Sequence, residues 1–271
     1  MDLSKLTVDD ARNISYVDFV SILNETNKPP GGKDTIRRIA INSFLTKESS
    51  VLEIGCNTGF SSIELSSLIK CKVTGIDMNE NAINAAKINA KSHLVDNDVS
   101  FSIGNAESLD YDSDAFDLIM CGGALAWVNN KRIAIGECTR VLKQWGFLTM
   151  VPFYYSTPPP PSLVDELNMA LSSNIQIWDK NYWLDFVRNE SDLEFYLIED
   201  KTIEHVSKDK IIDFVNGLLS PYKSSLSKAV FEVLQEKGNY FFSLFNENHR
   251  YLSYSIFLLR KRPIREQLVL F

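Results

Sequence analysis

The sequence has few of the residues that build redox and metal centres. Its 271 residues include four cysteines and three histidines. Cys56, Cys71, Cys121 and Cys138 are scattered, with neither CxxC spacing nor the density of a disulfide framework, so we expect a reducing, cytoplasmic environment. No Cys, His and acidic residues share the spacing of metal ligands, and we therefore expect no metal site.

Long apolar runs and extended basic tracts are also missing. No run approaches the ~20 residues that cross a bilayer. Residues 1–10 lack the basic and apolar regions of a signal peptide, so we expect no membrane partner. The formal net charge is −7, and the one basic tract, 260–265, reads more simply as a solvated strand end than as a phosphate-binding surface. We therefore expect no nucleic-acid partner. The sequence leaves the oligomeric state open.

Strand-like and helix-like segments alternate between residues 50 and 155. The first strand runs into Glu53, and further strands are predicted at 72–77, 99–104, 116–121 and 146–155. Helices are predicted between them, at 60–70, 79–94 and 130–143. This rhythm implies right-handed crossovers and a parallel, doubly wound α/β sheet.

Helical segments precede this core. Thr7 with Asp10 can cap a first helix, and Asp34 can cap a second. We interpret residues 1–48 as an N-terminal helical lid and residues 49–155 as the ligand-binding core.

The remaining segment, residues 156–271, is less regular. We expect the rest of the sheet there, with strands at 193–206 and 251–260. The stretch between them, about 207–250, is long enough for two or three helices. We interpret it as a helical cap inserted over the active site.

The strand-to-helix turn at 51–59 reads Val-Leu-Glu-Ile-Gly-Cys-Asn-Thr-Gly. Its glycines allow positive φ and a close approach of the backbone to a ligand, and the following helix presents unpaired N–H groups. The spacing E-x-G-x-N-x-G differs from the G-x-G-x-x-G of dinucleotide-binding turns. It resembles motif I of the class I S-adenosylmethionine-dependent methyltransferases of the small-molecule type, in which this turn holds the methionine part of the cofactor. Asn57 stands where that family more often has glycine.

Asp77 ends the second predicted strand, 24 residues after Glu53. A carboxylate at about this distance from a glycine turn can accept hydrogen bonds from both hydroxyls of a ribose. The resemblance implies that Asp77 holds the adenosyl ribose and that Met78 flanks the adenine. Stabilisation of a helix N-terminus is the alternative role for Asp77 alone.

The segments that follow the third and fourth predicted strands also resemble cofactor-binding segments. Residues 104–107 read Gly-Asn-Ala-Glu and resemble the family's G-D-A-E segment, which contacts the adenine edge. The carbonyl of Asn105 can accept where the family has a carboxylate, and a plain Asn turn is the alternative. Residues 121–124 read Cys-Gly-Gly-Ala, and their glycines suggest a close approach to the sulfonium, with a simple turn as the alternative.

The resemblance implies a Rossmann-like, doubly wound, seven-stranded sheet with an antiparallel last strand, and S-adenosyl-L-methionine as the cofactor. It also implies a set of cofactor-binding residues, namely Tyr16, Glu53, Gly55, Cys56, Asn57, Gly59, Asp77, Met78, Asn105, Ala106, Glu107, Cys121 and Gly122. Tyr16 belongs to this set because the first helix can close over the cofactor and bring the tyrosine to its carboxylate.

Four side chains are candidates for the substrate pocket. Trp127 follows the fourth predicted strand, Tyr154 and Tyr155 end the fifth, and His205 flanks the cap insertion. Ordinary packing is the alternative for each. No catalytic residue is evident, because a sulfonium carries its own leaving group and a general base is needed only for a protonated acceptor.

The sequence lacks the elements typical of DNA methylation, since Cys-Gly-Gly-Ala stands where an Asn-Pro-Pro-Tyr element would lie. We therefore predict a methyltransferase that acts on an oxygen or nitrogen atom of a small-molecule acceptor. Two alternatives stay open: another enzyme that uses the same cofactor on the same fold, and a catalytically silent scaffold that binds the cofactor.

Overall fold

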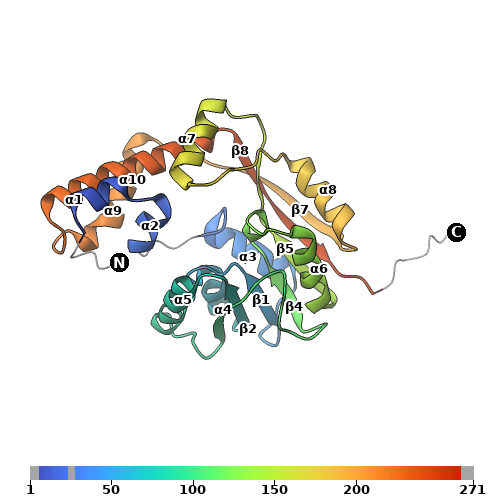
Figure 1. Ribbon diagram of the computed structural model, residues 1–271. Helices are drawn as coiled ribbons and strands as arrows, with labels where there is room; N and C mark the ends of the chain where they lie inside the picture. Colours follow the sequence, from blue (N-terminus) through green and yellow to red (C-terminus); the bar gives the residue numbers. More distant parts are fainter. Residues whose placement is uncertain (1–5, 24–27, 264–271) are drawn as a thin grey trace. The chain divides into compact units, whose positions relative to one another are not determined.

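The computed structural model describes residues 6–23 and 28–263 (Figure 1). Residues 1–5 and 24–27 of the predicted lid, and residues 264–271, lie outside the described residues. Contacts divide the chain into two compact units. The sheet unit comprises the described residues of Asn27–Phe153, Lys180–Lys201 and Tyr254–Phe271, and the helical unit those of Met1–Thr26, Tyr154–Asp179 and Thr202–Ser253.

One sheet runs through the sheet unit. Its strands are β1 (Ser50–Ile54), β2 (Lys72–Asp77), β3 (Val99–Ile103), β4 (Phe116–Met120), β5 (Leu142–Met150), β6 (Phe153–Tyr155), β7 (Glu194–Thr202) and β8 (Leu252–Arg260). The helices of this unit are α3 (Gly32–Asn42), α4 (Phe60–Ile69), α5 (Glu80–Ser92), α6 (Lys131–Val141) and α8 (Lys180–Glu190). The boundary with the helical unit falls within β6, β7 and β8.

The strands follow the order β3-β2-β1-β4-β5-β8-β6, with β7 also paired to β8. Neighbours from β3 to β5 are parallel, and β8 runs antiparallel to β5. The chain builds β2 and β3 on one side of β1 and then β4 and β5 on the other, so the strand order reverses between β1 and β4. The predicted doubly wound sheet with an antiparallel last strand is confirmed.

The predicted strand at 146–155 is wrong in its extent, because two strands occupy this segment. β5 begins earlier, at Leu142, and ends at Met150, and β6 begins at Phe153. Pro152 separates them, since proline has no N–H to donate to a strand ladder. The sheet therefore has eight strands in the described part of the chain instead of the seven expected.

The central strands are buried on both faces. Val51 and Leu52 of β1 and Leu118 and Ile119 of β4 have no exposed surface. Parallel strands covered by helices on both faces consist of nearly continuous apolar runs. The apolar run that predicted β4 reflects this double burial.

Polar side chains begin several helices at the predicted places. Thr7 and Asp10 form a capping box at the start of α1 (Val8–Asn13). Asn79 accepts hydrogen bonds from the first turn of α5, and Asn130 does the same for α6. These side chains satisfy N–H groups that have no partner within the helix.

The predicted Asp34 cap of α3 is wrong. The helix begins at Gly32, after Gly31 with a φ of +77°, so Asp34 lies within its first turn. There the carboxylate accepts a hydrogen bond of 2.7 Å from Nε of Arg38, and its charge complements the helix dipole.

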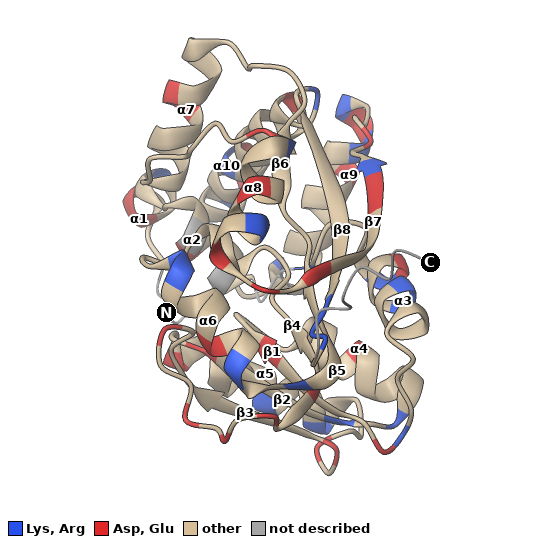
Figure 2. Cartoon of the chain, turned by 90° about the vertical axis from the view of Figure 1, so that its right-hand side faces the viewer, with Lys and Arg blue, Asp and Glu red and all other residues tan. Residues whose placement is uncertain are grey.

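One ion pair joins α3 to β7 within the sheet unit, and a second lies within β7. Arg38 Nη1 lies 2.6 Å from Glu199 Oε1, and Lys201 Nζ lies 2.8 Å from the same oxygen. Figure 2 shows basic and acidic residues in both elements. Each partly exposed pair contributes at most ~1 kcal/mol, and only the Arg38–Glu199 pair links α3 to β7.

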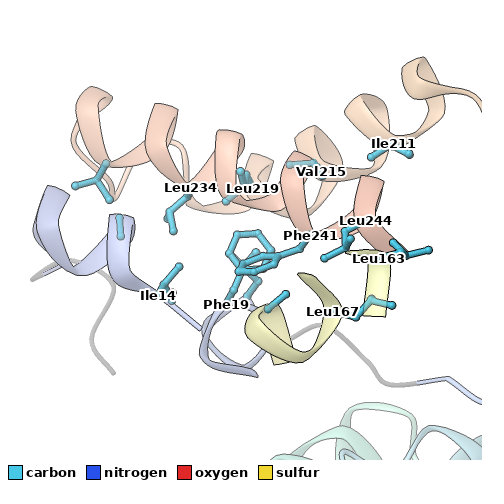
Figure 3. Close-up of a cluster of buried hydrophobic side chains, with 14 residues drawn as sticks. Ile14, Phe19, Leu163, Leu167, Ile211, Val215, Leu219, Leu234, Phe241 and Leu244 are labelled. Atoms are coloured by element: carbon cyan, nitrogen blue, oxygen red, sulfur yellow. The ribbon is translucent and has the colours of Figure 1, made fainter. Parts of the chain in front are cut away.

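The helical unit has a core of its own (Figure 3). Its helices are α1, α2 (Tyr16–Ile22), α7 (Pro161–Leu171), α9 (Lys208–Leu219) and α10 (Lys228–Asn248). Phe19 of α2 and Phe241 of α10 lie at the centre, with ring centroids 5.7 Å apart. Gly238 makes this packing possible, because a Cβ there would lie 2.8 Å from both Phe19 and Val215.

The contacts group the helices differently from the predicted lid, core and cap, whose roles stay predictions. The predicted lid is divided, since α1 and α2 belong to the helical unit and α3 to the sheet unit. The stretch predicted as a cap insertion contains α9 and α10, and these helices share their core with α1, α2 and α7.

Candidate functional site

The carboxyl ends of the parallel strands meet at one edge of the sheet. Glu53 of β1 lies between Gly75 of β2 and Met120 of β4, and Asp77 at the end of β2 lies beside Ile103 of β3. In doubly wound sheets, ligands bind outside this edge where the strand order reverses. Apart from Tyr16, the predicted cofactor-binding residues stand on these strands or on the turns that follow them.

The turn after β1 depends on residues with positive φ. Gly55, Asn57 and Gly59 have φ values of +71°, +47° and +88°. This region costs most residues roughly 1–2 kcal/mol, whereas glycine enters it freely and asparagine is the usual replacement. Asn57 is therefore explained: it meets the same backbone requirement as the glycine that is more common at this position. Its Oδ1 also accepts a hydrogen bond of 2.7 Å from the N–H of Thr58.

Substitutions of Asn57 should separate backbone conformation from side-chain chemistry. We expect Asn57→Gly to keep its affinity for S-adenosylhomocysteine within about twofold. Asn57→Val should lower the free energy of unfolding by ~1–2 kcal/mol and also weaken the affinity, because a β-branched residue is strained at this φ. Denaturant unfolding and calorimetric titration measure both quantities. Equal losses of stability and affinity in the two variants would show that the turn depends on the amide side chain of Asn57 and not on its backbone conformation.

Glu53 is a buried carboxyl group beside the turn, with 7% of its surface exposed. Its Oε2 accepts a hydrogen bond of 2.9 Å from the N–H of Ser62 in α4 and another from the Ser62 hydroxyl. Burial raises the pKa of Glu53 to about 7, although these hydrogen bonds lower it. The group therefore carries a proton in the ligand-free protein below neutral pH.

The raised pKa makes stability depend on pH. In the unfolded chain Glu53 has its ordinary pKa of 4.5. The protonated carboxyl group therefore contributes fully to the stability of the folded protein below that pH, and this contribution is lost as the pH rises through about 7. We expect the free energy of unfolding to fall by roughly 3 kcal/mol more across this window in the unchanged protein than in Glu53→Gln. Denaturant unfolding at several pH values measures the difference. Glu48→Gln, at a well-exposed position, is the control and should show the same dependence of the free energy of unfolding on pH as the unchanged protein. A Glu53→Gln variant with that same dependence would contradict the raised pKa of Glu53.

Asp77 joins the turn to the next helix. Its Oδ2 accepts a hydrogen bond of 3.0 Å from the N–H of Asn57, and its Oδ1 accepts one of 2.9 Å from the N–H of Asn79. Each carboxylate oxygen keeps a further lone pair. Asp77 can therefore hold the turn and accept hydrogen bonds from a ligand at the same time.

Two apolar side chains are exposed next to Asp77. Met78 is 72% exposed and Ile103 is 59% exposed. They stand at the ends of neighbouring strands and offer apolar surface for a flat ring. Sequence reasoning missed Ile103, although an apolar residue directly before the segment 104–107 was the available signal.

The segment 105–107 forms a turn that is hydrogen-bonded to the start of α6. Asn105 Oδ1 accepts a hydrogen bond of 2.9 Å from the N–H of Glu107, and Glu107 Oε1 accepts one of 3.0 Å from the N–H of Asn130. Ala106 is buried. The Asn turn weighed above as an alternative is thus present, and the second lone pair of the Asn105 carbonyl remains able to accept from a base.

The cysteines at this edge are buried thiols. Burial raises the pKa of Cys56, and the Cys121 thiol has a raised pKa because of the neighbouring Cys138 thiol, 3.9 Å away, and because of burial. Both stay protonated, so neither offers a thiolate to a ligand. Gly122 has a φ of +48°, and a Cβ there would meet nothing within 4 Å, which leaves open space beside the end of β4.

The candidate substrate residues are divided between the units. Trp127, 71% exposed, belongs to the sheet unit. In the helical unit, Tyr154 is buried, the Tyr155 hydroxyl donates to Asn248 Oδ1 at 3.2 Å, and His205 Nε2 lies 3.1 Å from Asn246 Nδ2. That these side chains form one pocket stays a prediction.

Tyr16 also belongs to the helical unit. Its ring packs edge-on against Phe245, with centroids 4.6 Å apart, and against Phe241 at 5.6 Å. Its predicted contact with the cofactor carboxylate stays a prediction.

The described ranges contain neither a cluster of metal ligands nor a helix that could cross a membrane. No three His, Cys, Asp or Glu side chains in residues 6–23 and 28–263 are grouped so that they could hold a metal ion. Within the same ranges, no helix combines the length and the apolar character that a membrane crossing requires.

The edge of the sheet fits the implied cofactor. Asp77 has acceptor capacity for hydroxyl groups, Met78 and Ile103 expose apolar surface for a base, and the space beside Gly122 is open. Fold and site together define a doubly wound α/β domain with a ligand site at the carboxyl ends of β1–β4.

Comparison with known families identifies this domain. Residues 45–238 match a family described as "Methyltransferase domain". The match covers more than half of the chain, and the chain belongs to this family. The domain is thus a methyltransferase domain.

Curated relatives align over parts of their length. A protein of Haemophilus influenzae is 26% identical over 167 residues, which cover 61% of this chain and 66% of the relative. The uncharacterized methyltransferase YcgJ of Bacillus subtilis is 34% identical over 45% of this chain and 46% of the relative. A demethylmenaquinone methyltransferase of Oceanobacillus iheyensis is 31% identical over 48% and 54%, respectively. The chain thus spans between 46% and 66% of the length of these three relatives.

Solved structures share the fold. The MccD protein superposes with a TM-score of 0.74 at 24% identity, over 87% of this chain and all of that chain. The [4+2]-cyclase SpnF has a TM-score of 0.68 at 18% identity, over 93% and 97%. A methyltransferase from Thiobacillus denitrificans, solved with S-adenosyl-L-homocysteine, has a TM-score of 0.67 at 15% identity, over 92% and 99%. At these identities the likeness concerns the fold.

Proposed function

We propose that this protein transfers the methyl group of S-adenosyl-L-methionine to an oxygen or nitrogen atom of a small-molecule acceptor. The observation that carries the proposal is the carboxyl edge of the sheet, where the positive-φ turn at 55–59 and the carboxylate of Asp77 are joined by a hydrogen bond. A turn of this kind lets the backbone approach a ligand closely, and an acid beside it can select a ribose.

Each cofactor-binding residue has a proposed role. The turn, from Gly55 to Gly59 and including Cys56 and Asn57, holds the methionine part near Glu53. Asp77 accepts from the ribose hydroxyls, and Met78 and Ile103 pack on the adenine. The remaining members are Asn105, Ala106 and Glu107 at the adenine edge, Cys121 and Gly122 near the sulfonium, and Tyr16 at the carboxylate.

The bound cofactor supplies an activated methyl group with a sulfonium leaving group. The work of the chain is then to position the acceptor and to exclude water. Trp127, Tyr154, Tyr155 and His205 are proposed to line the acceptor pocket. Burial raises the pKa of Tyr155, so its phenol stays protonated and can donate a hydrogen bond.

A carbon atom is a second candidate for the methylated position. The observation that favours it is the set of relatives named demethylmenaquinone methyltransferases, one of them 31% identical over 133 residues. A quinone-like ring as acceptor would agree with the aromatic candidates of the pocket. Because the shared fold includes a [4+2]-cyclase, the fold alone does not decide the reaction.

A transfer assay distinguishes these possibilities. The protein is incubated with S-adenosylmethionine labelled with ¹³C in its methyl group and with pools of small metabolites, and products are sought that gain one labelled methyl group in mass. The ¹³C chemical shift of the product then shows whether the methyl group is on oxygen, nitrogen or carbon. Binding of S-adenosylhomocysteine without any methylated product would favour the silent scaffold or another reaction over methyl transfer.

A further inference from the structure

The helical unit contains a cavity of about 320 Å³. It is bounded by α9, α10 and the segment that leads into α9. The lining residues are Glu204, Val206, Lys210, Ile211, Phe214, Phe242, Phe245, Asn246 and His249. This volume lies at the lower end of the ~300–1,000 Å³ that is usual for small-molecule sites.

The cavity borders the core of the helical unit, because Ile211 belongs to that core and Phe242 and Phe245 pack against it. Core residues such as Phe241 and Leu244 point toward α2 and α7 (Figure 3). The lining residues Phe242, Phe245 and His249 recur at a spacing of three or four, which places them on one common face of the helix. Phe242 and Phe245 are half-buried, so they contact the core and also line the cavity.

Aromatic rings form the walls. Phe214 of α9 and Phe242 of α10 meet edge-to-face, with centroids 4.9 Å apart and planes at 87°. Phe242 and Phe245 follow with centroids 6.5 Å apart. Ring faces and edges presented in this way suit another planar ring, which gains both apolar burial and favourable aromatic geometry.

One polar side chain is available at the cavity. The amide of Asn246 is already used, since its Oδ1 accepts from Val206 N at 2.9 Å and its Nδ2 contacts Val206 O and His205 Nε2. The imidazole of His249 forms no hydrogen bond with any residue in the described ranges. Burial and the neighbouring His205 lower the pKa of His249, so the ring is neutral near pH 7, with one nitrogen that donates and one that accepts.

The two charged residues of the lining form an ion pair with each other. Lys210 Nζ lies 3.6 Å from Glu204 Oε1, and both side chains are largely exposed. No unpaired charge is thus left to select an ionic ligand, and an ion placed among the phenylalanine rings would lose hydration without compensation.

From these observations we propose that the cavity binds an uncharged aromatic small molecule of one or two rings that carries a hydroxyl or carbonyl group. The rings lie among Phe214, Phe242 and Phe245, and the polar group exchanges a hydrogen bond with His249. The proposal goes beyond methyl transfer and does not depend on it, because binding is measured without cofactor or turnover.

The probe is 2-naphthol, titrated into the full-length protein and followed by calorimetry. We expect saturable one-to-one binding with a Kd below about 1 mM, the affinity that a ligand of this size can reach. Naphthalene should bind about fivefold more weakly, because it lacks the hydroxyl. The anion 2-naphthoate should also bind more weakly than 2-naphthol.

Matched variants locate the binding. Phe214 on α9 and Tyr240 on α10 are 43% and 42% exposed, and only Phe214 lines the cavity. Phe214→Ala should weaken 2-naphthol binding about fivefold, whereas Tyr240→Ala should leave it unchanged. His249→Leu should remove the preference for 2-naphthol over naphthalene. Circular dichroism confirms that each variant is folded.

Several results would overturn the proposal. They are the absence of saturable binding by folded protein, 2-naphthoate binding as tight as that of 2-naphthol, and equal losses in Phe214→Ala and Tyr240→Ala. Retention of the hydroxyl preference in His249→Leu would equally reject the assigned role of the histidine. None of these outcomes bears on methyl transfer, which the labelled-methyl assay tests separately.

Discussion

The Gly55→Ala variant is expected to bind S-adenosylhomocysteine at least ~30-fold more weakly than the unchanged protein. Gly55 has a φ of +71°, and a Cβ at this position would lie 2.6 Å from the Cβ of Ala124. Positive φ costs alanine roughly 1–2 kcal/mol, and the overlap adds roughly 1–3 kcal/mol. The turn relieves both the strain and the overlap by moving, and the movement displaces the backbone that we propose holds the cofactor.

Gly136 provides the control for this substitution. It lies in α6 of the sheet unit, and a Cβ there would meet nothing within 4 Å. Gly136→Ala should keep the affinity and raise the free energy of unfolding by ~0.5–1 kcal/mol, because alanine favours helix over glycine. Calorimetric titration of both variants, with thermal unfolding as the test of folding, gives the comparison. A folded Gly55→Ala protein with unchanged affinity would contradict the role of the turn.

The second large effect is expected at Asp77. In Asp77→Asn one carboxylate oxygen becomes an amide nitrogen, which cannot accept the hydrogen bond now donated by the N–H of Asn57 or Asn79. The variant also loses the charge that strengthens bonds from ribose hydroxyls. Hydrogen bonds to charged groups contribute ~1.5–3 kcal/mol each, so the affinity for S-adenosylhomocysteine should fall by roughly 10- to 100-fold.

A comparison of ligands separates ribose recognition from damage to the turn. The unchanged protein should prefer adenosine over 2′,3′-dideoxyadenosine, and Asp77→Asn should bind the two nearly equally. Asp98→Asn is the matched control, since Asp98 pairs with Lys72 at 2.7 Å at the opposite end of β2. It should keep both the affinity and the preference. An Asp77→Asn protein that still prefers adenosine would show that Asp77 serves the turn and not the ribose.

The sequence was most informative about the sheet and the turn that follows β1. The strands β1 to β4 were predictable from short apolar or alternating segments, and α5 and α6 because Asn79 and Asn130 cap them. Local chemistry decides these features. The wrong Asp34 cap shows the limit of such reasoning, since the N-cap is Gly31, which has positive φ and lies three residues earlier.

Features set by distant contacts could not be predicted. The fifth predicted strand is split at Pro152 into β5 and β6, and both of these strands pair with β8, which is distant in the sequence. The association of α1 and α2 with α9 and α10 depends on Phe19 and Gly238, which are more than two hundred residues apart. The pKa of Glu53 likewise follows from burial, which the sequence does not show.

The residues of the turn at 55–59 could be predicted because its backbone requires residues that tolerate positive φ. Positive φ explains Gly55, Gly59 and Asn57 together. Ile103 was missed because its importance comes from its register with Asp77 across two strands. His249 became a candidate for a ligand only when the cavity between α9 and α10 was known.

A crystal structure of the protein with S-adenosylhomocysteine tests the central claim most directly. We expect the ribose hydroxyls within hydrogen-bond distance of Asp77, the adenine between Met78 and the segment 103–107, and the amino-acid part over the turn at 55–59. A ligand bound elsewhere, or one whose ribose does not contact Asp77, would contradict the account of this site.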